Sequence, residues 1–214
     1  MDTILEASGP VIYTAMALAA LYGVFCAILM VRKIAQKRMS PGMASEFLDE
    51  TRELLQKKDF DGVAELCDSP PWWSKAVPQL VLYGIANRSI GPSKLKLMLA
   101  EKFERDVLAD LEYQGAWITT IVKTAPMLGL LGTVTGMILA FAKIATAAAS
   151  GGVNPADLAS DISFALFTTA AGLAIAIPLT VLGSWVQVRI GKLTDAVQEQ
   201  TTEFMSDLES AMRS

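Results

Sequence analysis

The sequence contains no histidine, only two cysteines and no long run of basic residues. The missing histidine removes the commonest metal ligand and the commonest general base near neutral pH. No CxxC pair, GxGxxG fingerprint, P-loop or GxSxG elbow occurs either. The net charge of −4, without a basic tract carrying interleaved aromatics, argues against nucleic acid as a partner. We therefore expect no enzyme activity, no metal and no cofactor.

The two cysteines, Cys26 and Cys67, fall in different kinds of sequence. Cys26 lies in a long apolar run, whereas Cys67 lies in a polar region that we expect in the cytoplasm. Disulfides are rare in that compartment, so we expect two buried thiols rather than a cross-link.

Apolar residues are abundant. The 214 residues are 52% hydrophobic, and the mean hydropathy is +0.41. These values exceed those of an ordinary soluble domain, so we expect apolar surface to face lipid. The sequence predicts an all-α membrane protein with three transmembrane helices, two of them long and extending into a cytoplasmic helical bundle.

The first uncharged run covers residues 11–31, which is long enough to cross a bilayer of about 30 Å at 1.5 Å per residue. Arg32, Lys33, Lys37 and Arg38 follow at once. The positive-inside rule therefore predicts an external N-terminus at residues 1–10 and a cytoplasmic chain from residue 32 onward. We expect this run to be a membrane span and not a cleavable signal peptide, because the leading segment carries no positive charge.

Residues 32–115 form the only sizeable polar region, which we expect to be a cytoplasmic helical domain. Ser45 is expected to open an amphipathic helix, and residues 60–67 to form a short second one. Trp72 and Trp73 suit either the packing of this small bundle, which we favour, or the membrane interface. A helical stripe should run without interruption into the second span, through Leu95, Leu99, Phe103, Val107 and Leu111.

The remaining chain divides into four segments. We expect transmembrane helices at residues 116–145 and 161–188, joined by an external loop at 146–160 that has no Lys or Arg. Residues 189–214 open with basic residues and continue the third span as an amphipathic C-terminal helix in the cytoplasm.

The second and third spans carry matching stripes of small residues at steps of 4, 3 and 4. The expected helix-packing positions, with one threonine in each stripe, are Gly129, Thr133, Gly136 and Ala140 in one span and Ala165, Thr169, Gly172 and Ala176 in the other. Pro126 and Pro178 are expected kinks on the cytoplasmic side of the two threonines, which puts both hydroxyls at middle depth. Thr135 and Thr168 add further hydroxyls beside the stripes.

These stripes support two interpretations. Small-residue faces pack membrane helices, and threonine often bonds back to its own helix. Alternatively, several copies enclose a narrow proton path lined by Thr133, Thr169, Thr168 and Thr135. Neither span has an acid near its centre, and a hydroxyl cannot hold a proton near neutral pH. A proton path would therefore need a carboxylate from another chain.

The segments Ala125-Pro-x-x-Gly-Leu-x-Gly-Thr-Val-x-Gly136 and Ala165-Leu-x-x-Thr-Ala-x-Gly-Leu-x-x-Ala-Ile-Pro178 resemble the ExbB/TolQ branch of the MotA/TolQ/ExbB proton-channel family. The resemblance implies a pentamer in the bacterial inner membrane. Its expected partners are a dimer of an ExbD/TolR-like single-span protein with an intramembrane Asp and a TonB/TolA-like envelope-spanning protein. The implied role is a stator subunit of a motor driven by the proton-motive force, with Thr133 and Thr169 as the pore threonines.

One position departs from the family pattern. Many ExbB-like proteins have a glutamate five residues before the pore threonine of the third span, where this sequence has Phe164. Asp161, three residues earlier on the same face, is the candidate ion-entry acid. A second hypothesis assigns the chain a structural role in place of ion conduction. In it the protein is a membrane scaffold whose Gly/Thr stripes only pack helices.

Overall fold

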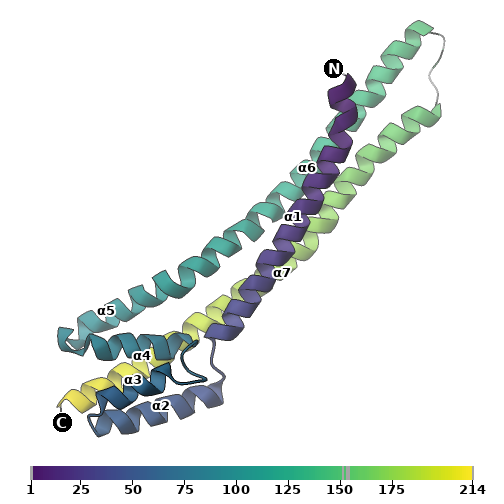
Figure 1. The fold of residues 1–214 in the computed structure, drawn as a ribbon. Coiled ribbons are helices and arrows are strands. Elements are labelled where there is room, and N and C mark those ends of the chain that lie inside the picture. The colour runs from purple at the N-terminus through teal and green to yellow at the C-terminus, as the bar shows by residue number, and fades with distance from the viewer. Residues whose placement is uncertain (1, 151, 153–154, 214) are drawn as a thin grey trace. The chain divides into compact units, whose positions relative to one another are not determined.

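The computed structural model describes residues 2–150, 152 and 155–213, and nearly all of them are helical (Figure 1). Within these residues there is no β-strand. In chain order the elements are α1 (Asp2–Lys37), α2 (Pro41–Gln56), α3 (Phe60–Asp68), α4 (Ala76–Ala86), the 3-10 turn η1 (Arg88–Ile90), α5 (Pro92–Phe103), the π-helical turn η2 (Glu104–Leu108), α6 (Ala109–Ser150) and α7 (Pro155–Arg213).

Three helical stretches are long and apolar enough to cross a membrane: α1, the continuous α5–α6 stretch, and α7. The predicted all-α membrane fold is therefore confirmed, including the two long helices. Helices α6 and α7 extend beyond the predicted spans, to Ser150 and from Pro155. Residues 151, 153 and 154 of the predicted external loop lie outside the described residues.

The chain divides into two compact units. Unit 1 comprises residues 1–28 and 115–185, which contain most of α1 and the middle parts of α6 and α7. A Cβ atom on Gly23 would lie 2.9 Å from Leu179 and 3.3 Å from Ile121, so α1 packs closely on both other helices. Gly9 approaches Phe164 in the same way. The residue numbers of the contacting pairs increase together, from Gly9 with Phe164 to Gly23 with Leu179, so α1 runs parallel to α7.

Unit 2 comprises residues 29–114 and 186–214. Its core is built from fully buried side chains of α2, α3, α4, α5 and the end of α7, among them Phe47, Val63, Val77, Leu99 and Phe204. The two tryptophans of the turn after α3 have different environments. Trp72 is buried and packs on Phe47 with ring centroids 5.2 Å apart, whereas Trp73 is exposed.

The start of α2 corrects one prediction. The helix begins at Pro41 rather than at Ser45, and Ser40 is its N-cap, accepting a hydrogen bond from the Met43 amide at 3.4 Å. Proline is favoured in the first helical turn because its fixed φ suits the helix and its missing N–H would have no partner there. The Ser40-Pro41 pair is therefore the signal for the start of this helix.

The π-helical turn η2 was not predicted. Leu95, Leu99, Phe103, Val107 and Leu111 are all buried, at four successive steps of four residues. In an α-helix each such step turns about 40° beyond a full rotation, so an unbroken series drifts around the helix. The wider π-turn lowers the rotation per residue and limits this drift. A long series of four-residue steps was thus the sequence signal for η2.

Candidate functional site

Small residues bring α6 and α7 together in unit 1. A Cβ on Gly129 would lie 2.8 Å from the backbone oxygen of Thr168 and 3.0 Å from the Cα of Thr169. A Cβ on Gly172 would lie 2.6 Å from the Ala125 oxygen. Such distances leave no room for a side chain, so the two backbones pack directly on each other. As the residue numbers of the contacting positions increase along α6, those of their partners in α7 decrease, so the two helices are antiparallel.

The other members of the two predicted stripes lie in the same contact. A Cβ on Gly136 would lie 2.8 Å from the Cβ of Ala165. Ala140 and Ala176 are also buried. Pro126 and Pro178 both lie inside continuous helices. Pro126 meets α7 at Gly172, where the Pro126 Cα would be 3.3 Å from an added Cβ.

Thr133 and Thr169 face each other across this contact. Their Oγ atoms are 2.5 Å apart, and either can be the donor. Each hydroxyl is also 3.1 Å from the Gly129 carbonyl oxygen, which lies in the same helix as Thr133 and in the helix opposite Thr169. Both side chains are only partly buried. The pair is therefore fixed by one backbone oxygen and still reaches the surface of this chain.

The two additional threonines occupy different places. Thr168 is 0% exposed, and its hydroxyl lies 2.8 Å from the Ala165 oxygen and 3.3 Å from the Gly129 oxygen. It fills the gap left by Gly132, so it packs inside the helix pair. Thr135 bonds only to carbonyls of its own helix, at Leu131 and Gly132, both at 3.0 Å.

An ion pair joins α6 and α7 toward the predicted outer end. Lys143 Nζ lies 2.6 Å and 2.9 Å from the two carboxylate oxygens of Asp161, whose side chain is 14% exposed. Lys143 was not predicted as a site residue. The sequence spacing could have indicated this pair. Lys143 is ten residues after Thr133 and Asp161 is eight residues before Thr169, so two antiparallel helices place Lys143 and Asp161 at similar depth.

Phe164, the residue at which the sequence departs from the expected family pattern, packs against α1. Its ring meets Tyr13 edge to face, with centroids 5.7 Å apart, and it borders Gly9. Phe164 therefore serves the contact between α1 and α7, while the acidic group of this region belongs to the Lys143 ion pair.

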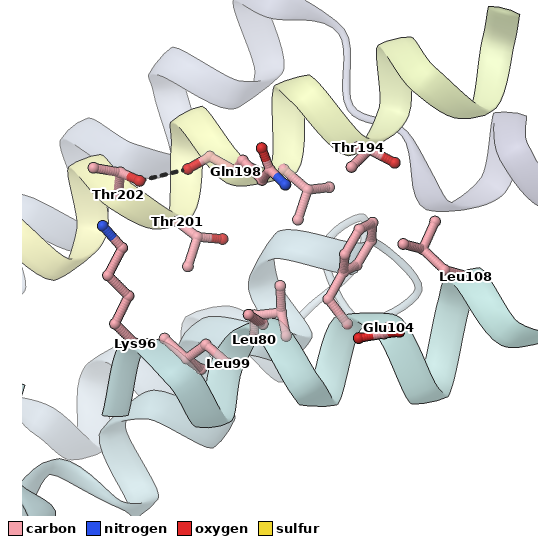
Figure 2. Close-up of a pocket in the computed structure, with 12 residues that line it drawn as sticks. Leu80, Lys96, Leu99, Glu104, Leu108, Thr194, Gln198, Thr201 and Thr202 are labelled. Atoms are coloured by element: carbon pink, nitrogen blue, oxygen red, sulfur yellow. Dashed lines mark hydrogen bonds between the residues drawn. The ribbon is translucent and has the colours of Figure 1, made fainter. Parts of the chain in front are cut away.

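Unit 2 contains a cavity of about 390 Å³ between α7 on one side and α4, α5 and η2 on the other (Figure 2). Apolar side chains such as Leu99 and Phe103 line one wall, and α7 contributes threonines and Gln198. The Thr201 hydroxyl is buried there without a hydrogen-bond partner, whereas Thr202 donates to the Gln198 carbonyl at 2.7 Å. No group of three or more metal-ligating side chains comes together within the described residues.

The sequence profile of the MotA/TolQ/ExbB proton channel family matches residues 74–199, which are more than half of the chain and include all of α6 and α7 as far as residue 199. This chain belongs to that family. Its relatives are named ExbB, which places the chain in the ExbB/TolQ branch. The membrane-spanning character of the three apolar helices agrees with this membership.

Three relatives illustrate the extent of the similarity. An ExbB homologue of Methanothermobacter thermautotrophicus is 28% identical over 202 residues, which cover 92% of this chain and 67% of that protein. The biopolymer transport protein exbB1 of Vibrio cholerae is 41% identical over 80 residues, 36% of this chain and 34% of its own length. ExbB of Aquifex aeolicus is 43% identical over 65 residues, 30% of this chain and 42% of its own length. The chain thus matches less than half of the Vibrio and Aquifex relatives.

Proposed function

We propose that this chain is the channel-forming subunit of an inner-membrane motor driven by the proton-motive force. Several copies, five by family resemblance, surround an ExbD/TolR-like single-span partner whose intramembrane Asp carries the proton. The assembly energises transport or mechanical work at the cell envelope, in contact with a TonB/TolA-like protein. In the proposed orientation the N-terminus is outside and the C-terminus is in the cytoplasm.

The observation that carries this proposal is the partly exposed pair of Thr133 and Thr169. Hydroxyls inside a membrane helix pair are costly unless they are hydrogen-bonded, and here the Gly129 carbonyl holds both. The uncharged centres of α6 and α7 provide no titrating group of their own. The pair can accept or donate a hydrogen bond but cannot store a proton. A carboxylate on the partner supplies that step.

We restrict the proposed path to Thr133 and Thr169. Thr168 is closed off by its own helix pair, and Thr135 is satisfied by its own helix. We assign Asp161 to the outer end of the path, where Lys143 holds its carboxylate. Proton entry there would require this ion pair to open or exchange with water.

The test is proton flux into vesicles containing the chain co-expressed with its partner. Thr133→Val and Thr169→Val keep the side-chain shape and remove the hydroxyl, so we expect assembled complexes with flux reduced at least tenfold. Thr→Ser at either position should retain most of the flux. Thr180→Val is the matched control, because Thr180 bonds to the Ala176 carbonyl of its own helix at 2.7 Å.

The scaffold alternative predicts a different pattern. If the stripes only pack helices, both valine variants should assemble and support growth as wild type does, and no single-span protein should co-purify. Wild-type flux in both valine variants would therefore refute the pore assignment. A loss of flux in Thr180→Val as well would show that the assay reports general helix packing.

A further inference from the structure

Four cations follow the apolar stretch of α1 that ends at Val31: Arg32, Lys33 and Lys37 on the helix and Arg38 directly after it. Lys37 is six residues beyond Val31 on one continuous helix, which places it about 9 Å past the edge of the hydrocarbon. The headgroup layer on each side of a bilayer is roughly 5–8 Å thick. Arg32 and Lys33 therefore lie within the headgroup layer, and the long side chains of Lys37 and Arg38 lie at its outer edge, from which they can reach toward the phosphates.

The turn between α3 and α4 is attached to this end of α1 within unit 2. Lys37 donates to the Gln79 side-chain oxygen at 2.9 Å, and the Gln79 amide donates to the Trp73 carbonyl at 2.9 Å. Lys75 donates to the Arg38 carbonyl at 3.0 Å, closing the C-terminus of α1. Three hydrogen bonds thus hold the turn at the depth of Lys37 and Arg38.

The two tryptophans of this turn differ in exposure. Trp72 is 6% exposed, whereas Trp73 is 59% exposed. Packing of unit 2 explains Trp72 through its contact with Phe47, but it does not account for a large aromatic side chain left outside. Tryptophan is enriched where a membrane meets water, because its ring is apolar and its N–H can still find a polar partner.

The charge around Trp73 is positive. Lys75 joins the four cations that follow Val31. Three carboxylates belong to the same part of unit 2: Asp110 pairs with Lys33, Asp106 acts on Lys37, and Asp68 ends α3 directly before the turn. Arg32 is exposed and Arg38 is half-buried. Five cations against these three carboxylates leave an excess of positive charge around this end of α1.

We propose that Arg32, Lys33, Lys37, Arg38, Trp73 and Lys75 form a binding surface for the headgroups of anionic phospholipids, with Trp73 in the membrane interface. We call it the headgroup surface. The bilayer is the occupant because the surface continues a membrane-spanning helix and carries the complementary charge. It anchors unit 2 to the membrane through a second point beside α1, and it does not depend on ion conduction.

The experiment uses the full chain in lipid nanodiscs that contain phosphatidylcholine and phosphatidylglycerol in one fixed proportion. In one set the phosphatidylglycerol is brominated near the top of its acyl chains. In the other set an equal amount of phosphatidylcholine is brominated instead. Bromine quenches tryptophan fluorescence at short range, and subtracting the signal of Trp73→Phe isolates the contribution of Trp73.

We expect the Trp73 signal to be quenched in both sets, and more strongly when bromine is on phosphatidylglycerol. Each cation at an anionic surface changes local lipid affinity about fivefold. Arg32→Gln/Arg38→Gln should therefore bring quenching by the two lipids to the same level. Lys57→Gln/Lys94→Gln is the matched control with the same charge change. These exposed residues lie at the ends of α2 and α5 away from the end of α1 (Figure 1).

Two results would overturn the proposal. A Trp73 signal that brominated lipid does not quench would place the residue in water or under another protein. Equal quenching by both lipids in the wild type would show that Trp73 lies in the membrane interface but that the headgroup surface does not prefer anionic phospholipids. Helicity and elution volume of each variant confirm that the compared proteins are folded, and Trp73→Tyr provides a second, conservative replacement.

Discussion

At the scale of single residues, Gly129 decides the geometry of the candidate site. Its missing side chain lets α7 approach, and its carbonyl oxygen lies within hydrogen-bond distance of the hydroxyls of Thr133, Thr168 and Thr169. The sequence indicated that Thr133 and Thr169 lie in the contact between the two helices, because they sit on stripes of small residues. The sequence could not indicate that the Gly129 carbonyl binds both hydroxyls. Every residue has a carbonyl, and only the contact between the two helices brings this one close to Thr133 and Thr169.

We predict that Gly129→Ala destabilises the helix pair by about 1–3 kcal/mol, as for an overpacked core. The new methyl group would meet backbone atoms of Thr168 and Thr169, which cannot rotate away as a side chain can. Thermal unfolding in nanodiscs measures the effect. Gly191→Ala is the control, because nothing lies within 4 Å of an added Cβ there. An alanine in that open helical position should be neutral or stabilising.

Cys67 makes stability depend on alkaline pH. Burial, with a smaller contribution from Asp68, raises the pKa of its thiol from 9.0 to about 12. The unfolded chain therefore loses this proton before the folded chain does. The contribution to stability is complete below pH 9 and is lost as the pH rises toward 12.

The measurement is the free energy of unfolding at several pH values between 8 and 11, for the wild type and Cys67→Ala. The variant lacks the thiol but keeps all other titrating groups, so its stability should fall less steeply with pH. Parallel curves would contradict the assigned pKa. Alkylation at pH 8 should also leave Cys67 unmodified until the protein is unfolded, because the thiol is buried.

At the scale of elements, the long helices were predictable and their internal irregularity was not. Residues 94–114 contain no Pro or Gly, which is why an uninterrupted helix was expected. The turn η2 changes the hydrogen-bond pattern and the winding of the backbone, and no residue type marks it. It is visible in the sequence only through the four-residue spacing of the buried side chains from Leu95 to Leu111.

The cavity beside η2 leads to a prediction about α7. The Thr201 hydroxyl is buried there without a hydrogen-bond partner (Figure 2), and such a group costs about 1–3 kcal/mol. Thr201→Val keeps the shape and removes this cost, so it should raise the thermal unfolding midpoint. Thr202→Val is the control one residue away, where the hydroxyl is already bonded to Gln198. A lower midpoint for Thr201→Val would show that the hydroxyl has a partner.

At the scale of the whole molecule, charge asymmetry gives the proposed orientation. Cations follow the first and third apolar runs, whereas the connection between α6 and α7 has no Lys or Arg. This pattern could be read from the sequence, because the positive-inside rule needs no tertiary contact. The association of several copies could not be read from the sequence. A membrane-facing surface is apolar whether it meets lipid or another copy of the chain, so composition does not distinguish the two.

The orientation predicts which exposed positions react with a membrane-impermeant maleimide in intact cells. In a background without Cys26 and Cys67, Asp157→Cys should be labelled from outside. Met212→Cys, at the far end of α7, should be labelled only after the membrane is permeabilised. Both native positions are exposed, so access rather than burial decides the result. The reverse pattern would mean that the chain is inserted with its C-terminus outside.

The hydrogen bond between Thr133 and Thr169 has a consequence for direction. Each hydroxyl has one proton, and at 2.5 Å either oxygen can donate to the other or to the shared Gly129 carbonyl. The two arrangements use the same heavy-atom positions and are exchanged by rotating the hydroxyl groups. The hydrogen bond between the two hydroxyls can therefore point in either direction without movement of the heavy atoms. In the proposed proton path, the direction of flow would then be set by the electrochemical gradient and by the asymmetry of the partner.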